Sequence, residues 1–216
     1  MRILLFFLSL NIVCLAQDNA DDWHLKKYHH DIAVYSRKTV NSDFRELKSI
    51  VYLKTSLNSI VALINDRETY PQWVYKCGQA TVLKKISASE LIHYQTVIAP
   101  WPAENRDFVV NIKLTQDEKT KIVTIKSTCN ANYIPKVARH IRITEFNASW
   151  ILIPLKDGTV QINYQLMVHP GGYVPAWLVN MAAIDGPYET MIHFKEWVFK
   201  EKYQKVKNPL VKELND

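Results

Sequence analysis

The sequence predicts an α+β fold in which a curved antiparallel sheet wraps around one long C-terminal helix. From Trp73 to His169, apolar residues recur with a period of two in six segments joined by short turns, as in antiparallel strands. After a Pro-Gly-Gly break, apolar residues follow helical spacing from Ala176 to about Tyr203. A single long helix after so many strands must bury its apolar face against the sheet. The sheet and the helix together enclose either a hydrophobic core or a pocket.

The first residues carry the pattern of a secretory signal. Met1-Arg2 precedes a short apolar run that ends in Cys14-Leu15-Ala16. We therefore expect residues 1–16 to be removed and residues 17–216 to form one exported domain, periplasmic or extracellular. Removing Arg2 takes the net charge from +6 to +5. Lipid modification of Cys14 is the alternative interpretation.

The segments before the strands mix helix and hairpin. Asp21-Asp22 predicts the cap of a short helix that runs to about His30. Residues 32–38 and 44–54 alternate and form a hairpin. Ser56 caps a helix with apolar positions at helical spacing, and a turn over 66–70 ends at Pro71.

The later strands are expected at 78–86, 90–99, 106–115, 121–129, 141–154 and 159–169. Pro187 should bend the C-terminal helix, because proline removes an intrahelical hydrogen bond. No linker or repeat divides this pattern, which favours one domain.

Several classes of site are not indicated. Cys77 and Cys129 either form a disulfide or are two small buried residues. The nearby histidines His24, His29 and His30 are flanked by lysines, which favours a solvated basic segment over a metal cluster. Basic residues are scattered and alternate with acids, so no nucleic-acid partner is expected.

The strand at 106–115 contains the most informative residue. Phe108, Val110 and Ile112 share one face, and period-two counting places Arg106 on the same apolar side. A guanidinium cannot be left bare in a core. Either it reaches water at the end of the strand, or it faces an internal polar feature such as a ligand head group. Glu90 and Glu104 are possible partners by sequence proximity.

The connection at 130–139 is longer than its neighbours. It carries Tyr133, Ile134 and Val137 among small and basic residues. Such apolar side chains either pin a loop to the body of the protein or belong to a lid that touches an apolar ligand.

Several ordered stretches together resemble the START lipid-binding domain. They are Trp23 with Ile32, Val34-Tyr35 and Arg37; Ile64, Asp66 and Tyr70-Pro71-Gln72-Trp73-Val74; Val82-Leu83-Lys84-Lys85-Ile86; Trp101-Pro102 with Asn105-Arg106-Asp107-Phe108-Val109; and Pro170-Gly171-Gly172 with Pro175 and Trp177-Leu178-Val179-Asn180. The resemblance implies a helix-grip fold with a hydrophobic tunnel for one lipid or sterol. It also implies that Arg106 lies in the tunnel and that the loop at 130–139 guards its entrance. The acidic partner of that arginine has no counterpart here, since His93 and Gln95 stand where it would be expected.

The resulting hypothesis is a non-enzymatic, exported lipid-binding or lipid-transfer protein that holds one hydrophobic ligand, a lipid or sterol-like molecule. We expect no cofactor or metal, a monomer, and transient contact with membranes. The expected ligand-binding residues are Arg106, Phe108, Val110, Ile112, Val160, Ile162, Tyr164, Leu166, Met181 and Tyr188. The expected entrance residues are Tyr133, Ile134, Pro135, Val137, Val179 and Ala183.

The alternative is an enzyme, because helix-grip proteins include cyclases of the aromatase type that act on hydrophobic substrates. Catalysis would need acid or base groups that converge in the tunnel. The candidates are His93, Tyr94, His140 and Tyr164, but strand phase places His93 and Tyr94 on opposite faces.

Overall fold

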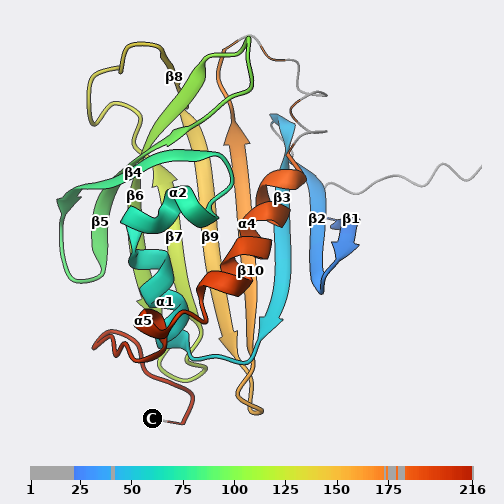
Figure 1. Cartoon of the computed structure of the whole chain (residues 1–216), viewed down its shortest axis with the longest axis vertical. Coiled ribbons are helices and arrows are strands. Elements are labelled where there is room, and N and C mark those ends of the chain that lie inside the picture. Colours follow the sequence, from blue (N-terminus) through green and yellow to red (C-terminus); the bar gives the residue numbers. More distant parts are fainter. Residues whose placement is uncertain (1–21, 40–41, 173, 175–178, 180–182, 216) are drawn as a thin grey trace, which may run out of the picture.

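The computed structural model describes residues 22–39, 42–172, 174, 179 and 183–215, which form a ten-stranded sheet with helices on one face (Figure 1). The strands are β1 His24–His29, β2 Ile32–Thr39, β3 Ser42–Leu53, β4 Cys77–Lys85, β5 Glu90–Val97, β6 Asn105–Gln116, β7 Val123–Cys129, β8 His140–Arg142, β9 Glu145–Pro154 and β10 Val160–His169. The helices are α1 Leu57–Asn65, the short 3-10 helix η1 Arg67–Thr69, α2 Tyr70–Trp73, α4 Asp185–Trp197 and α5 Glu201–Gln204.

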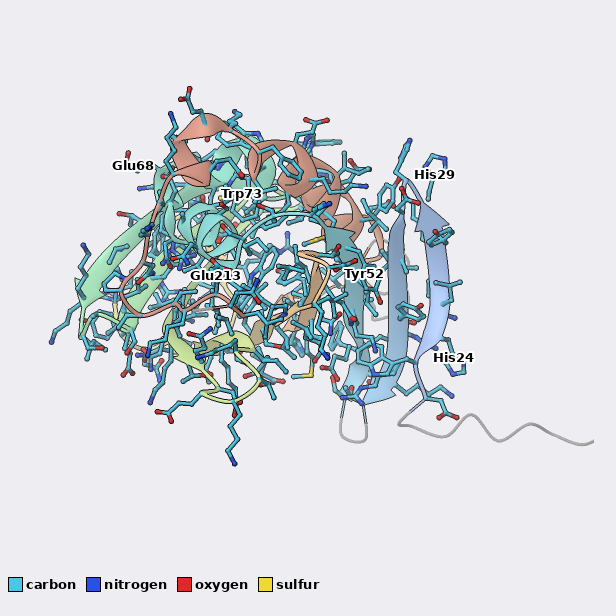
Figure 2. All side chains as sticks on the ribbon, turned by 90° about the horizontal axis from the view of Figure 1, so that it is seen from below. His24, His29, Tyr52, Glu68, Trp73 and Glu213 are labelled. Atoms are coloured by element: carbon cyan, nitrogen blue, oxygen red, sulfur yellow. The ribbon has the colours of Figure 1, made fainter. Side chains whose placement is uncertain are left out.

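The sheet is open and almost entirely antiparallel. Its strand order is β1-β2-β3-β10-β9-β7-β6-β5-β4, and β8 pairs with β6 in parallel. Strands β3 and β10 therefore join the N-terminal hairpin to the rest of the sheet. Figure 2 shows β1 at one edge, with His24 and His29 at opposite ends of the strand and Trp73 on the far side, among the helices.

The C-terminal helix α4 packs on the same face as α1 and α2. Its buried Phe194 lies against Trp73 of α2 and Trp150 of β9, with ring centroids 5.5 and 5.1 Å apart. Edge and tilted contacts of this kind suit aromatic rings. This cluster fixes α4 against the sheet.

Helix α1 begins where the sequence predicts. The side chain of Ser56 accepts a hydrogen bond from the backbone N–H of Ser59. The C-terminal segment adds a second cap, because the Glu213 carboxylate accepts from the N–H groups of Leu57 and Asn58 at 3.0 Å each. A carboxylate at a helix N-terminus also interacts favourably with the helix dipole.

The predicted fold class is confirmed, and so are the N-terminal hairpin and the alternating strands. The helix expected up to His30 is wrong, since these residues form β1. Leu25 and Tyr28 stand three apart, which imitates helical spacing, but a bulge between Leu25 and Lys27 produces that spacing in a strand. The expected strand 141–154 is two strands, because β8 turns aside to pair with β6.

The single helix expected from Ala176 to Tyr203 is also divided in its described part. Helix α4 ends at Trp197 and α5 begins at Glu201. Val198 and Tyr203 are both buried, yet five residues apart they would project from different sides of one helix, so the chain turns between them. Pro187 lies in the first turn of α4, where proline is tolerated. Most of 176–182 lies outside the described residues.

Candidate functional site

A cavity of about 540 Å³ lies between the sheet and the helices. Its walls come from β3, β5, β6, β7, β9 and β10, from the η1–α2 segment and from the start of α4. This volume is within the range of small-molecule sites. The cavity is therefore the leading candidate for a ligand site.

Apolar side chains form most of the wall. They include Phe108, Val110, Ile112, Ile125, Phe146, Ala148, Trp150, Tyr164 and Leu166. Phe108 stacks on Phe146 at 4.6 Å, and Trp150 stacks on Tyr164 at 4.4 Å. The first pair joins β6 and β9 of the same sheet, and the second joins the neighbouring strands β9 and β10, so the wall is shaped before any ligand arrives.

The structure brings together six of the ten residues expected to bind a ligand: Arg106, Phe108, Val110, Ile112, Tyr164 and Leu166 line the cavity. Val160 and Ile162 are buried in the core and do not line it. Tyr188 is buried on α4, where its hydroxyl contacts the rings of His29 and His30 at 3.1 and 3.0 Å. Met181 lies outside the described residues.

Arg106 lies inside, with 9% of its surface exposed, and its Nη1 donates to the backbone carbonyl of Glu104. No carboxylate among the described residues forms an ion pair with it. Two further polar side chains of the cavity wall, His93 and Gln95, come from the neighbouring strand β5, and His93 Nε2 lies 3.2 Å from Gln95 Oε1. A second arginine, Arg67 of η1, also faces the cavity and is 5% exposed. The sequence did not indicate Arg67 as a site residue, because residues 66–70 were predicted only to form a turn.

The long loop at 130–139 is fastened to the opposite face of the sheet. Ile134 packs against Ile92, Tyr94 and Val109, which form a small cluster on the face of β5 and β6 that points away from the cavity. None of the expected loop residues 133, 134, 135 and 137 lines the cavity, whereas Val179 and Ala183 do. Figure 1 shows the loop beside β8, away from α4.

A buried ion pair holds this loop. Arg142 of β8 donates from Nε and Nη2 to the two carboxylate oxygens of Asp107, each at 2.9 Å. Its Nη1 donates to the loop carbonyls of Ala131 and Ile134, and its Nη2 also donates to that of Pro135, at 2.6 to 3.1 Å. Such bidentate pairing gives strong directional bonds. The sequence offered no signal for it beyond the Arg-Asp dipeptide of β6.

The connection between β5 and β6 forms one rim of the cavity. Ile98, Ala99, Pro100 and Ala103 line the cavity, and Trp101 at the tip is 93% exposed. Lys76, also in the wall, accepts a hydrogen bond at its carbonyl from the N–H of Ile98 at 2.8 Å. An almost fully exposed tryptophan beside an apolar cavity is an unusual surface feature.

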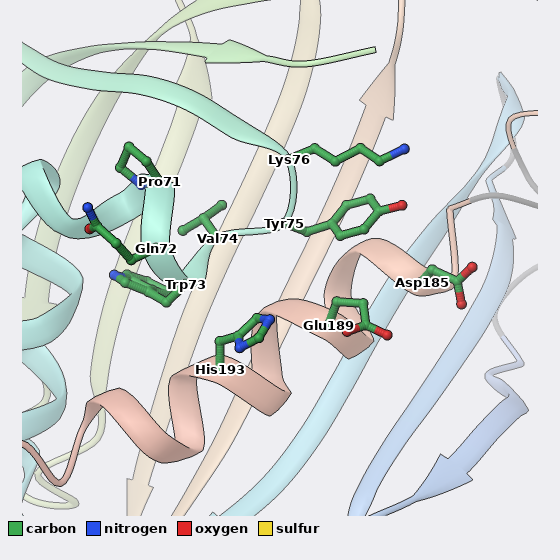
Figure 3. A pocket seen from close by; sticks show the side chains of 9 residues that line it. All are labelled: Pro71, Gln72, Trp73, Val74, Tyr75, Lys76, Asp185, Glu189 and His193. Carbon is green, nitrogen blue, oxygen red and sulfur yellow. The ribbon is translucent and has the colours of Figure 1, made fainter. Parts of the chain in front are cut away.

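The segment from Trp73 to Lys76 lines both the cavity and a groove on the outer surface (Figure 3). On the other side of the groove lie Asp185, Glu189 and His193 of α4. The Tyr75 N–H donates to the Thr190 hydroxyl at 3.1 Å, which ties this segment to α4. The wall between cavity and groove is therefore a single chain segment attached to the helix.

The two candidate acid–base groups inside the cavity do not titrate near neutral pH. Burial, together with the neighbouring charge of Arg67, lowers the pKa of His93 to about 3. Burial raises the pKa of Tyr164 to about 12. General acid–base catalysis works best with a pKa near the working pH. The predicted separation of His93 and Tyr94 on opposite faces is confirmed, since Tyr94 belongs to the outer cluster.

The cysteines and possible ion sites add nothing to the cavity chemistry. Cys77 and Cys129 are both free, and burial raises the pKa of Cys77 to about 12. Within the described ranges, no group of three or more His, Cys, Asp or Glu side chains is placed to hold a metal ion. Nor does the described part of the chain contain a helix long and apolar enough to span a membrane.

An open antiparallel sheet and a C-terminal helix that enclose an apolar cavity define the helix-grip class of proteins. Residues 11–198 match the family model described as the START domain, and the chain belongs to that family. The resemblance found in the sequence is thus confirmed. The match begins inside the expected signal segment 1–16.

Three relatives place the chain within this class. A STAR-related lipid transfer protein fragment from Xanthomonas axonopodis is 29% identical, with a TM-score of 0.77, and the match covers 83% of this chain and 100% of that one. The phosphatidylcholine transfer protein of Mus musculus is 24% identical over 172 residues, or 76% of this chain and 78% of the relative. An aromatase/cyclase from Streptomyces is 9% identical, with a TM-score of 0.50 over 76% of this chain and 96% of that one, a likeness of fold alone. The family supports lipid binding by this chain.

Proposed function

We propose that this protein is an exported, non-enzymatic carrier that holds one hydrophobic ligand in its cavity and exchanges it with membranes. The observation that carries the proposal is the apolar cavity of about 540 Å³ beneath α4. Each 100 Å² of apolar ligand surface removed from water contributes about 2.5 kcal/mol, so such a wall needs few polar contacts to bind a lipid. The named transfer proteins among the relatives support the same function.

The test is to purify the protein, extract it into organic solvent and identify bound lipid by mass spectrometry, before and after incubation with phospholipid vesicles. Ala148 lines the cavity on β9, so the large side chain of Ala148→Trp should narrow the cavity and reduce loading. The neighbouring Asn147 is exposed on the other face of the strand, and Asn147→Trp is the matched control. Equal loading of the two variants, or no lipid in a folded wild-type protein, would refute the proposal.

Membrane contact is proposed at the rim that carries Trp101. Tryptophan favours the membrane–water interface, and Ile98 on the same connection is 52% exposed. Arg45 and Lys76 of the cavity wall add positive charge, which suits an anionic membrane surface. A lipid could then leave the bilayer directly into the cavity.

Export follows from the N-terminal pattern of the sequence. The expected outcome is that protein recovered from the periplasm or medium begins at Gln17, as N-terminal sequencing would show. Recovery of the intact chain only from the cell interior would contradict this part of the proposal.

A further inference from the structure

The described wall of the cavity carries basic side chains and no carboxylate. The described residues that line the cavity include Arg45, Arg67, Lys76 and Arg106, and no Asp or Glu. The sequence itself has no acidic residue from 158 to 184, the stretch that leads into α4. The cavity therefore favours a negatively charged group.

Arg67 is the basic group of the wall whose buried donors lack a hydrogen-bonding partner among the described residues. Its Nε and Nη2 atoms are buried and make no hydrogen bond with any described residue. The guanidinium lies 4.9 Å from the centroid of the Tyr70 ring. Burial lowers the pKa of Arg67 to about 9, which still leaves it charged at neutral pH. A buried charge without hydrogen bonds is costly and rarely retained without a role.

The carboxylates beside Arg67 in the sequence do not compensate it. Asp66 accepts from Lys202 Nζ at 2.7 Å and from the Tyr203 hydroxyl at 2.9 Å. Glu68 is exposed and lies at the periphery of the molecule in Figure 2. The 3-10 turn thus directs its arginine inward and its flanking acids outward.

The polar groups of the same turn and of α2 are, by contrast, satisfied within the fold. The Tyr70 hydroxyl donates to the Ile64 carbonyl at 2.7 Å. Trp73 Nε1 donates to Thr69 Oγ1 at 3.1 Å, and the Thr69 hydroxyl donates to the Asp66 carbonyl at 2.8 Å. The turn is thereby fixed in place by its own bonds, so Arg67 is not needed to build it. The Nε and Nη2 donors of Arg67 remain available to a ligand in the cavity.

We propose that Arg67, with His93 and Gln95 beside it, forms a subsite for the anionic head group of a lipid. The proposal rests on the lipid-carrier function and names its ligand class. A guanidinium fork matches the oxygens of a phosphate or carboxylate. A choline group next to the phosphate would instead be repelled, because no described carboxylate of the wall offsets Arg67 and Arg106.

The test uses mixed vesicles, so that surface attraction to the membrane is the same for both lipids. Lipid-free protein is incubated with vesicles containing equal amounts of phosphatidylglycerol and phosphatidylcholine with identical chains, and the loaded lipids are quantified by mass spectrometry. The wild-type protein should load phosphatidylglycerol in at least tenfold excess, because both lipids offer a phosphate to Arg67 but only the choline of phosphatidylcholine adds a positive charge that Arg67 and Arg106 repel. Arg67→Met should load the two about equally while total loading persists.

A matched control removes one positive charge elsewhere. Lys156 is exposed in the β9–β10 turn, and Lys156→Gln should keep the wild-type preference. Arg67→Gln, which keeps a polar side chain, serves as a second variant if Arg67→Met does not fold. The lipid-free Arg67→Met protein should also melt at a higher temperature than lipid-free wild type, because a buried unpaired charge is gone. A lower melting temperature would show a structural role and count against the subsite.

The source of the anion is resolved in two further arms. Vesicles containing oleate in place of phosphatidylglycerol report whether a carboxylate suffices. A preference for phosphatidylglycerol or for oleate over phosphatidylcholine supports the subsite. Inorganic phosphate should raise the melting temperature of the lipid-free protein far less than the lipid does, because phosphate buries no apolar surface. Protection by phosphate equal to that by lipid would overturn the proposal, as would loading without preference in wild type or a preference unchanged in both Arg67 variants. Absence of any loaded lipid would instead refute the carrier function on which the subsite rests.

Discussion

At the scale of single residues, the ion pair between Asp107 and Arg142 is the most consequential contact outside the cavity. The two side chains are 0% and 3% exposed. Breaking a buried pair leaves an uncompensated charge, so Arg142→Met should lower the free energy of unfolding by about 3–5 kcal/mol. It should also speed hydrogen exchange in the loop at 130–139. Denaturant unfolding and amide exchange measure the two effects.

Arg142→Lys provides the matched comparison. Lysine keeps the charge but not the guanidinium fork that reaches both Asp107 and the loop carbonyls. The free energy of unfolding and the exchange rate of the loop should therefore lie between those of wild type and Arg142→Met. A loop that exchanges as slowly in Arg142→Met as in wild type would show that Ile134 packing alone secures it.

His93 should make the stability of the protein depend on pH. Its pKa is about 3 in the fold and about 6.5 in an unfolded chain, so the unfolded state binds the extra proton as the pH falls. The stability that neutral His93 contributes is present above pH 6.5 and is lost between about 6.5 and 3, with a slope of at most about 1.4 kcal/mol per pH unit.

The comparison is with His93→Gln, measured by chemical denaturation at several pH values. The difference in free energy of unfolding between the two proteins should be constant from pH 7 to 8. Below pH 6 the wild-type protein should lose stability relative to the variant. Parallel curves down to pH 4 would mean that His93 takes up its proton equally in the folded and unfolded states.

At the scale of elements, the β5–β6 connection should act as the membrane contact. Trp101→Ala should slow lipid exchange between vesicles about tenfold, because the loss of a large interfacial side chain weakens membrane contact. The change should alter the free energy of unfolding by no more than about 0.5 kcal/mol, since the side chain is 93% exposed. Fluorescent-lipid transfer and thermal melting measure the two.

Tyr52 is the matched control for this element. It is an aromatic side chain on β3 that is 56% exposed and does not line the cavity. Tyr52→Ala should transfer lipid at the wild-type rate. Equal slowing by both substitutions would show that general surface apolarity, rather than this rim, governs exchange.

The strands and α1 could be predicted from the sequence because their signals are local. Alternation marks β2 and β9, and Ser56 with its apolar spacing marks α1. The errors have non-local causes. The β1 bulge imitates a helix, and β8 is created by pairing with a distant part of β6.

The same distinction holds for the cavity. Arg106 could be found because strand phase alone places it on the apolar face. Arg67 could not, since nothing in a turn sequence tells which way one arginine of a charged triplet points. That direction is set when Asp66 meets Lys202 and Tyr203 more than a hundred residues later.

At the scale of the whole molecule, an open sheet has two edges that other chains could extend. The edge strand β4 carries Lys84 and Lys85 and is interrupted by bulges, and β1 carries Lys26 and Lys27 and a bulge of its own. Lysines and bulges at edges discourage strand addition. Because all the described cavity walls come from one chain, a monomer suffices for the proposed function.

The expected outcome is a monomer across a wide concentration range in sedimentation or light scattering. Replacing both Lys84 and Lys85 with Val should cause concentration-dependent association, because the edge then offers free backbone groups beside apolar side chains, including Leu83, which is already 37% exposed. Lys156→Val, in a turn rather than on an edge, should remain monomeric. A wild-type protein that already sediments as a dimer would show that an edge or another surface is used for assembly, and the double variant would then locate it.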